Sequence, residues 1–69
     1  MNKDELKTRF LNEFNNVFDK DGNIKNCGRE SCLALISKAE ALKPDTYFGN
    51  MMTGFMNAEN IKKLHDELI

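Results

Sequence analysis

The chain has 69 residues, a formal net charge of −1, five Phe, four Met, two Cys and no Trp. A chain this short forms one domain, residues 1–69, and buries only about 60% of the surface that its unfolded state exposes, so its stability is marginal. The balanced charge argues against a general nucleic-acid binder, which needs many Lys and Arg at phosphates. No apolar run approaches the roughly 20 residues of a membrane span. The N-terminal stretch is too charged for a signal peptide, so we expect a cytoplasmic protein without a membrane partner.

The first predicted element is a helix over residues 2–18. At about 100° per residue, its large apolar side chains fall in one stripe about 140° wide. The stripe consists of Leu6, Phe10, Leu11, Phe14, Val17 and Phe18. Asp4 and Glu5 lie in the first turn, where their charges favour the helix dipole.

A loop over residues 19–28 follows, with Asp-Gly and Gly-Asn turn dipeptides at its centre. It connects two helices as a solvated turn, or forms a minor β-hairpin at residues 17–25 around Asp-Gly. Asp19, Asp21 and Asn23 match the first three ligand positions of a calcium loop. The sixth position of such a loop requires Gly for a tight turn, but here it is Ile24. We therefore expect no bound metal, and keep a metal- or thiol-responsive switch at residues 19–32 as an alternative.

Both cysteines, Cys27 and Cys32, lie at the end of this loop. A disulfide between them is geometrically feasible if Cys27 precedes the next helix. Cys27 beside Arg29, near a helix N-terminus, is also typical of a reactive thiol. The alternative is structural, with Cys32 in the core and Cys27 covering the helix start. Zinc would find only His65 as a further soft ligand, so we expect no cofactor.

The second predicted helix covers residues 29–43 and ends at Pro44, because proline pushes the preceding residue out of the helical region. One face of this helix carries Cys32, Leu35, Ile36, Ala39 and Leu42.

A third helix is predicted to open at Pro44-Asp45 and to continue through Met56. Its large apolar residues recur at three- and four-residue spacing. They are Tyr47, Phe48, Met51, Met52, Phe55 and Met56. Gly49 and Gly54 weaken this helix by about 1 kcal/mol each relative to alanine. An ordered loop over residues 48–57 is the alternative.

Asn57 is the predicted N-cap of the last helix. Ile61, Leu64, Leu68 and Ile69 line one side of it, and His65 lies among them. On an apolar face we expect this histidine to pack rather than to act as a catalytic base. The sequence thus predicts an all-α domain of three to four short helices around a Phe/Leu/Met core.

The Met/Phe-rich stretch also suggests a function. Methionine suits adaptable binding surfaces, and six large apolar residues in ten exceed what so small a core readily covers, so an exposed patch is expected. The alternative is that all six residues belong to the core. We therefore expect a non-catalytic protein-binding module or regulator rather than an enzyme. Such composition is typical of small regulators and of phage-encoded proteins directed at the host. The same six residues would contact the partner, and a second copy of the chain is the simplest partner.

Residues 33–68 resemble the helix-turn-helix of small phage repressors of the Cro type. Residues 35–42 would form its first helix, Pro44-Asp-Thr would open the second, and residues 61–68 would pack against both. The resemblance implies a DNA-binding transcriptional regulator. The chain departs from that family at the recognition surface, because residues 46–53 offer only Asn50 and no basic side chain to bases or phosphates.

Overall fold

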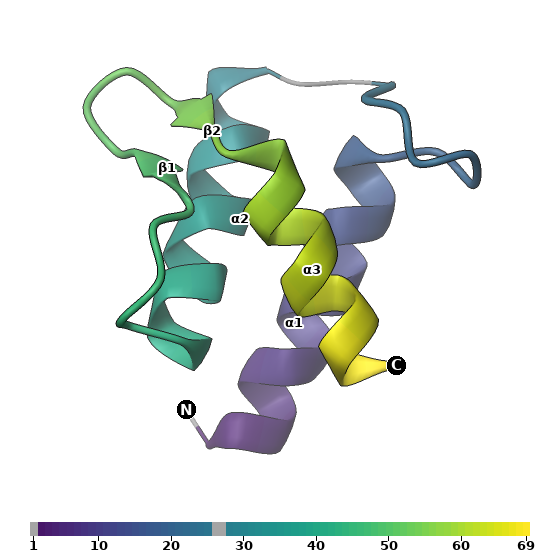
Figure 1. Cartoon of the computed structure of the whole chain (residues 1–69), viewed down its shortest axis with the longest axis vertical. Coiled ribbons are helices and arrows are strands. Elements are labelled where there is room, and N and C mark those ends of the chain that lie inside the picture. Colours follow the sequence, from purple (N-terminus) through teal and green to yellow (C-terminus); the bar gives the residue numbers. More distant parts are fainter. Residues whose placement is uncertain (1, 26–27) are drawn as a thin grey trace.

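A computed structural model describes residues 2–25 and 28–69 of the chain. In chain order the elements are α1 (Lys3–Val17), α2 (Arg29–Leu42), β1 (Gly49–Asn50), β2 (Phe55–Met56) and α3 (Ala58–Leu68). Figure 1 shows α3 crossing in front of α1, with α2 beside them and the β1–β2 hairpin standing out beside α2. The expected small, mainly α-helical domain is confirmed. No helix within the described residues has the length and apolar character needed to cross a membrane.

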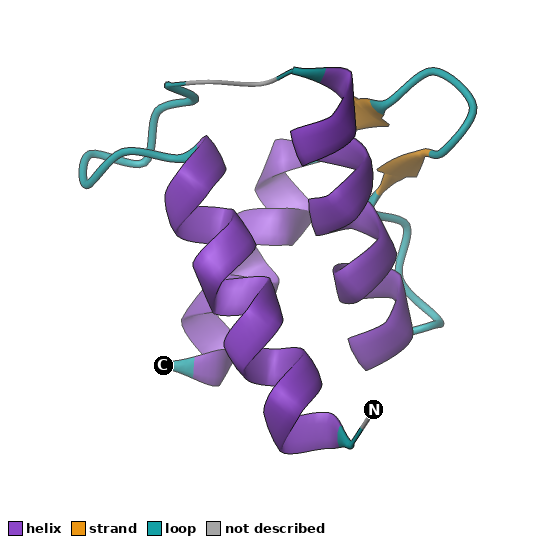
Figure 2. Ribbon diagram, turned by 180° about the vertical axis from the view of Figure 1, so that it is seen from behind, coloured by secondary structure: helices purple, strands orange, loops and turns teal. Residues whose placement is uncertain are grey.

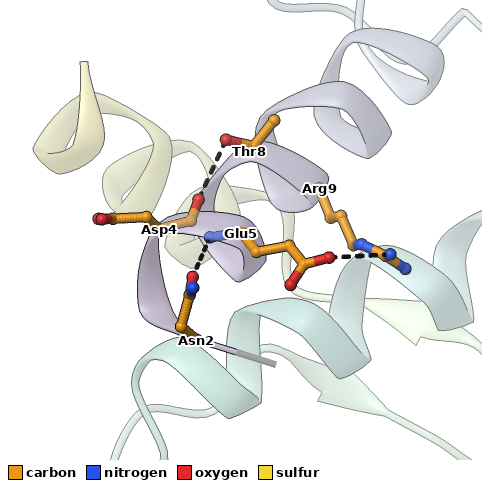
Figure 3. A network of polar contacts seen from close by, with 5 residues as sticks. All are labelled: Asn2, Asp4, Glu5, Thr8 and Arg9. Carbon is orange, nitrogen blue, oxygen red and sulfur yellow. Dashed lines mark hydrogen bonds and ion pairs between the residues drawn. The ribbon is translucent and has the colours of Figure 1, made fainter.

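Local polar contacts define the start of α1 (Figure 3). The Asn2 side chain accepts a hydrogen bond of 2.7 Å from the backbone N–H of Glu5, which satisfies one of the free donors of the first turn. Thr8 donates to the Asp4 carbonyl, and Arg9 pairs with Glu5 one turn away. Because Asn2 has an extended backbone, the helix begins at Lys3, one residue later than predicted.

In the loop after α1 the structure has the minor hairpin at residues 17–25 that the sequence left as the alternative to a solvated turn. Phe18 and Ile24 form a single antiparallel bridge. The Lys25 N–H donates to the Val17 carbonyl at 2.8 Å. Gly22 has a φ of 81°, a conformation that glycine adopts without strain. The turn dipeptides of the sequence therefore act as predicted.

The core lies between the three helices of the described chain, and α1 packs most extensively on α2 (Figure 2). Its members come from the predicted apolar faces of all three helices and from Phe48, which precedes β1. The core consists of Phe10, Phe14, Val17, Phe18, Cys32, Leu35, Ile36, Ala39, Phe48, Ile61 and Leu64. Leu6, assigned to the predicted apolar stripe of α1, is only half-buried.

The predicted helix from Pro44 to Met56 is wrong. The chain instead forms a β-hairpin in which Gly49 pairs with Met56 and Asn50 with Phe55. Gly54 has a φ of 75°, which an α-helix does not allow. The hairpin allows Phe48 to enter the core, while the loop between β1 and β2 turns outward.

Candidate interaction surface

The β1–β2 hairpin presents a group of large apolar side chains to solvent. Met52 is 84% exposed, Phe55 75%, Tyr47 59% and Met51 44%. Met51 and Met52 lie in the loop between the strands, Phe55 begins β2, and Tyr47 precedes β1 by two residues. We call these four residues the hairpin tip. Large exposed apolar groups often serve as interaction sites, so the hairpin tip is a candidate contact surface.

Two of the six residues predicted to contact a partner lie elsewhere. Phe48 is 1% exposed and belongs to the core, so it is not part of the surface. Met56 is half-buried and packs against the core. The reason is the alternation of a β-strand, in which neighbouring side chains point to opposite faces. Within β2, Phe55 is thereby exposed while Met56 turns toward the core.

The loop of the hairpin is held by hydrogen bonds from its own residues. The Asn50 side-chain oxygen accepts from the N–H of Met52 at 2.8 Å and of Thr53 at 3.3 Å. The Gly54 N–H donates to the Asn50 carbonyl at 2.8 Å. Thr53 Oγ1 accepts from the N–H of Phe55 at 3.2 Å. Asn50 and Thr53 thus shape the loop, and both side chains are types that favour such local bonds.

Further contacts fasten the hairpin to the helices. The Asn57 N–H donates to the Phe48 carbonyl, and the Asn60 side chain donates to the Tyr47 carbonyl, each at 2.8 Å. At the loop, Arg29 Nη2 donates to the Met52 carbonyl at 2.6 Å. Sequence reasoning missed this role of Arg29, because 23 residues separate it from Met52 and no local pattern connects them.

The loop after α1 uses its acidic oxygens internally. Asp19 Oδ1 accepts from the N–H of Asp21 and of Asn23, each at 2.9 Å. This bonding shapes a turn. In residues 2–25 and 28–69, no three His, Cys, Asp or Glu side chains come close enough together to hold a metal ion.

Of the two cysteines of the predicted redox site, the structure describes only Cys32. Cys32 is buried in the first turn of α2. Cys27 lies outside the described residues. The redox hypothesis therefore stays a prediction.

His65 packs in the way expected of a histidine on an apolar helix face. Its ring stacks on Phe14 with the centroids 3.9 Å apart and 15° between the planes. It borders a shallow cavity of about 360 Å³ whose charged residues include Asp19, Lys20 and Lys62. The charges there are of both signs, so this cavity has no clear preference for an anion or a cation.

Comparisons with protein-family models, with curated proteins and with solved structures find no match for this chain.

Proposed function

We propose that this protein is a non-catalytic protein-binding module or regulator, and that the hairpin tip is its contact surface. The exposure of Met52 and Phe55 on a hydrogen-bonded loop carries the proposal. Four side chains exposed to this degree present on the order of 500 Å² of mainly apolar surface. Patches of that size on monomers are often functional.

The first partner that we propose is a second copy of the chain. Two tips in contact would together bury on the order of 1,000 Å², which is the lower limit for a specific interface. A pair of identical patches can meet across a two-fold axis. Since the area is only just sufficient, we expect a weak and reversible dimer.

The helix-turn-helix resemblance supports a DNA-binding role less well. The segment that would supply its recognition helix is the β-hairpin, and the exposed side chains of that hairpin are mainly apolar. DNA affinity would require cationic side chains at phosphates. We therefore keep the protein-binding proposal alone.

The test compares Met52→Asp with a matched control, Ile69→Asp. Both side chains are large, apolar and more than three-quarters exposed, but Ile69 lies at the end of the molecule away from the hairpin (Figure 1). Sedimentation from micromolar to millimolar concentration would measure self-association. We expect association in the wild type and in Ile69→Asp, and at least a tenfold weaker association in Met52→Asp, because a buried unpaired charge is costly.

A second arm immobilises the same three proteins, exposes them to a cell lysate and quantifies what each retains. A partner bound through the tip is retained by the wild type and by Ile69→Asp but not by Met52→Asp. The proposal is wrong if the wild type neither self-associates nor retains a partner, or if Met52→Asp behaves like the wild type in both arms.

A further inference from the structure

Arg29 contacts the loop of the hairpin at two points. It is the first residue of α2, and its Nη2 donates to the Met52 carbonyl at 2.6 Å. Its stem also lies close to Gly54, since a Cβ built on that glycine would be 3.1 Å from Arg29 Cγ. The head and the stem of one side chain thus rest on two residues of the same loop.

The bond from Arg29 differs in kind from the others made by the loop. The bonds from Asn50 and Thr53 run between residues 50 and 55, so they set the shape of the loop. The bond from Arg29 joins the loop to α2, so it sets the position of the loop relative to the helices. A guanidinium donor also gives a stronger bond than a neutral one.

We infer that Arg29 is a positioning residue, which holds the hairpin tip in its binding orientation. This inference rests on the proposed function. A loop that is already ordered loses less conformational freedom on binding, so affinity rises without any additional contact to the partner. Arg29 donates its hydrogen bond to the backbone carbonyl of Met52, so the Met52 side chain stays exposed to a partner.

The experiment uses Arg29→Met, which keeps an unbranched stem but removes the donors, and Arg29→Lys, which restores a cationic donor. Arg9→Met is the control, because Arg9 is an exposed arginine on α1 whose partner is Glu5. The first measurement needs no partner. It is amide hydrogen exchange at Met52, Thr53 and Gly54, followed by NMR.

We expect exchange at these three amides to be roughly five- to tenfold faster in Arg29→Met, the effect of losing one charged hydrogen bond from an exposed site. Arg29→Lys should recover part of the protection, and Arg9→Met should match the wild type. Exchange in the core of α1 should be unchanged in all three variants. This pattern separates a loss of positioning from a general loss of stability.

The second measurement repeats the sedimentation and capture arms with the Arg29 variants. Binding should be about three- to tenfold weaker in Arg29→Met and intermediate in Arg29→Lys. The inference is overturned if exchange at the tip is unchanged in Arg29→Met, or if exchange rises while binding that depends on Met52 stays at the wild-type level. If Met52→Asp itself leaves all binding unchanged, the proposed function fails, and the role of Arg29 in binding fails with it.

Discussion

Gly49 is a residue at which the backbone of the hairpin lies close to α2. A Cβ built there would be 2.6 Å from Ile36 Cδ1 and 2.7 Å from the Phe55 carbonyl oxygen. Real Cβ atoms essentially never approach other atoms so closely, and one of these two neighbours is backbone. The residue also has a φ of 154°, which L side chains rarely adopt. The absence of a side chain at position 49 is what allows β1 to lie against the core.

The substitution Gly49→Ala is therefore expected to lower the free energy of unfolding by about 2–3 kcal/mol, the usual effect of overpacking. The control is Gly28→Ala, because a Cβ at Gly28 meets no atom within 4 Å. We expect that change to cost less than about 1 kcal/mol. Urea unfolding followed by circular dichroism would measure both, and equal effects of the two substitutions would contradict the prediction.

At the level of elements, the three helices could be predicted from sequence because two independent signals agreed. Apolar spacing marked their buried faces, and side-chain caps or breakers marked their ends, as Asn57 and Pro44 do. The predicted bounds of 2–18 and 29–43 differ from Lys3–Val17 and Arg29–Leu42 by one residue at three of the four ends, and agree at Arg29. Consistency between pattern and capping is the condition under which single-sequence prediction works.

The hairpin could not be predicted in the same way, because its apolar residues imitate a helical spacing. Met51, Met52 and Phe55 recur at three and four residues, but each is exposed in a loop or on the outer face of a strand. The signals against a helix were Gly49 and Gly54. These positions require glycine because Gly49 lies close to Ile36 and Gly54 close to Arg29, contacts that form only in the folded chain.

Asn57 marks the boundary between the hairpin and α3, and its side-chain oxygen accepts from the Asn60 N–H at 3.1 Å. We expect Asn57→Ala to cost about 1 kcal/mol, as loss of an N-cap usually does. For a domain of this size that corresponds to a fall of roughly 4–8 °C in Tm.

The matched control for this prediction is Asn12→Ala, at an exposed position inside α1. Alanine is the better helix former there, so Tm should stay the same or rise slightly. Thermal denaturation followed by far-UV circular dichroism would compare the two variants. A fall in Tm of equal size for both would show that the cap contributes nothing specific.

For the molecule as a whole, the small core leaves little stability to lose. At about 0.05–0.15 kcal/mol per residue, a domain of this length has roughly 3–10 kcal/mol. The salt bridge between Lys43 and Glu67 joins the end of α2 to α3, but both side chains are about half exposed. Such a pair contributes at most about 1 kcal/mol. We therefore expect the buried apolar side chains to provide most of the stability.

Phe10 tests this conclusion, because it is fully buried between the helices. Phe10→Ala should cost about 3–5 kcal/mol, which is comparable with the whole stability of the domain. We expect its helical signal at 25 °C to be largely lost or its denaturant midpoint to fall steeply. Phe55→Ala removes the same group from an exposed site, and should change the midpoint little. Similar losses in the two variants would contradict the assignment of the core.

The position of the hairpin relative to the chain ends has a practical consequence. Figures 1 and 2 both place the hairpin at one end of the molecule and the ends of the chain at the other. A tether attached at Asn2 or at Ile69 would therefore leave the hairpin at the end of the molecule away from the support. Linked end to end with flexible spacers, several copies would present all of their tips at once, and such an array would convert a weak single contact into avid binding.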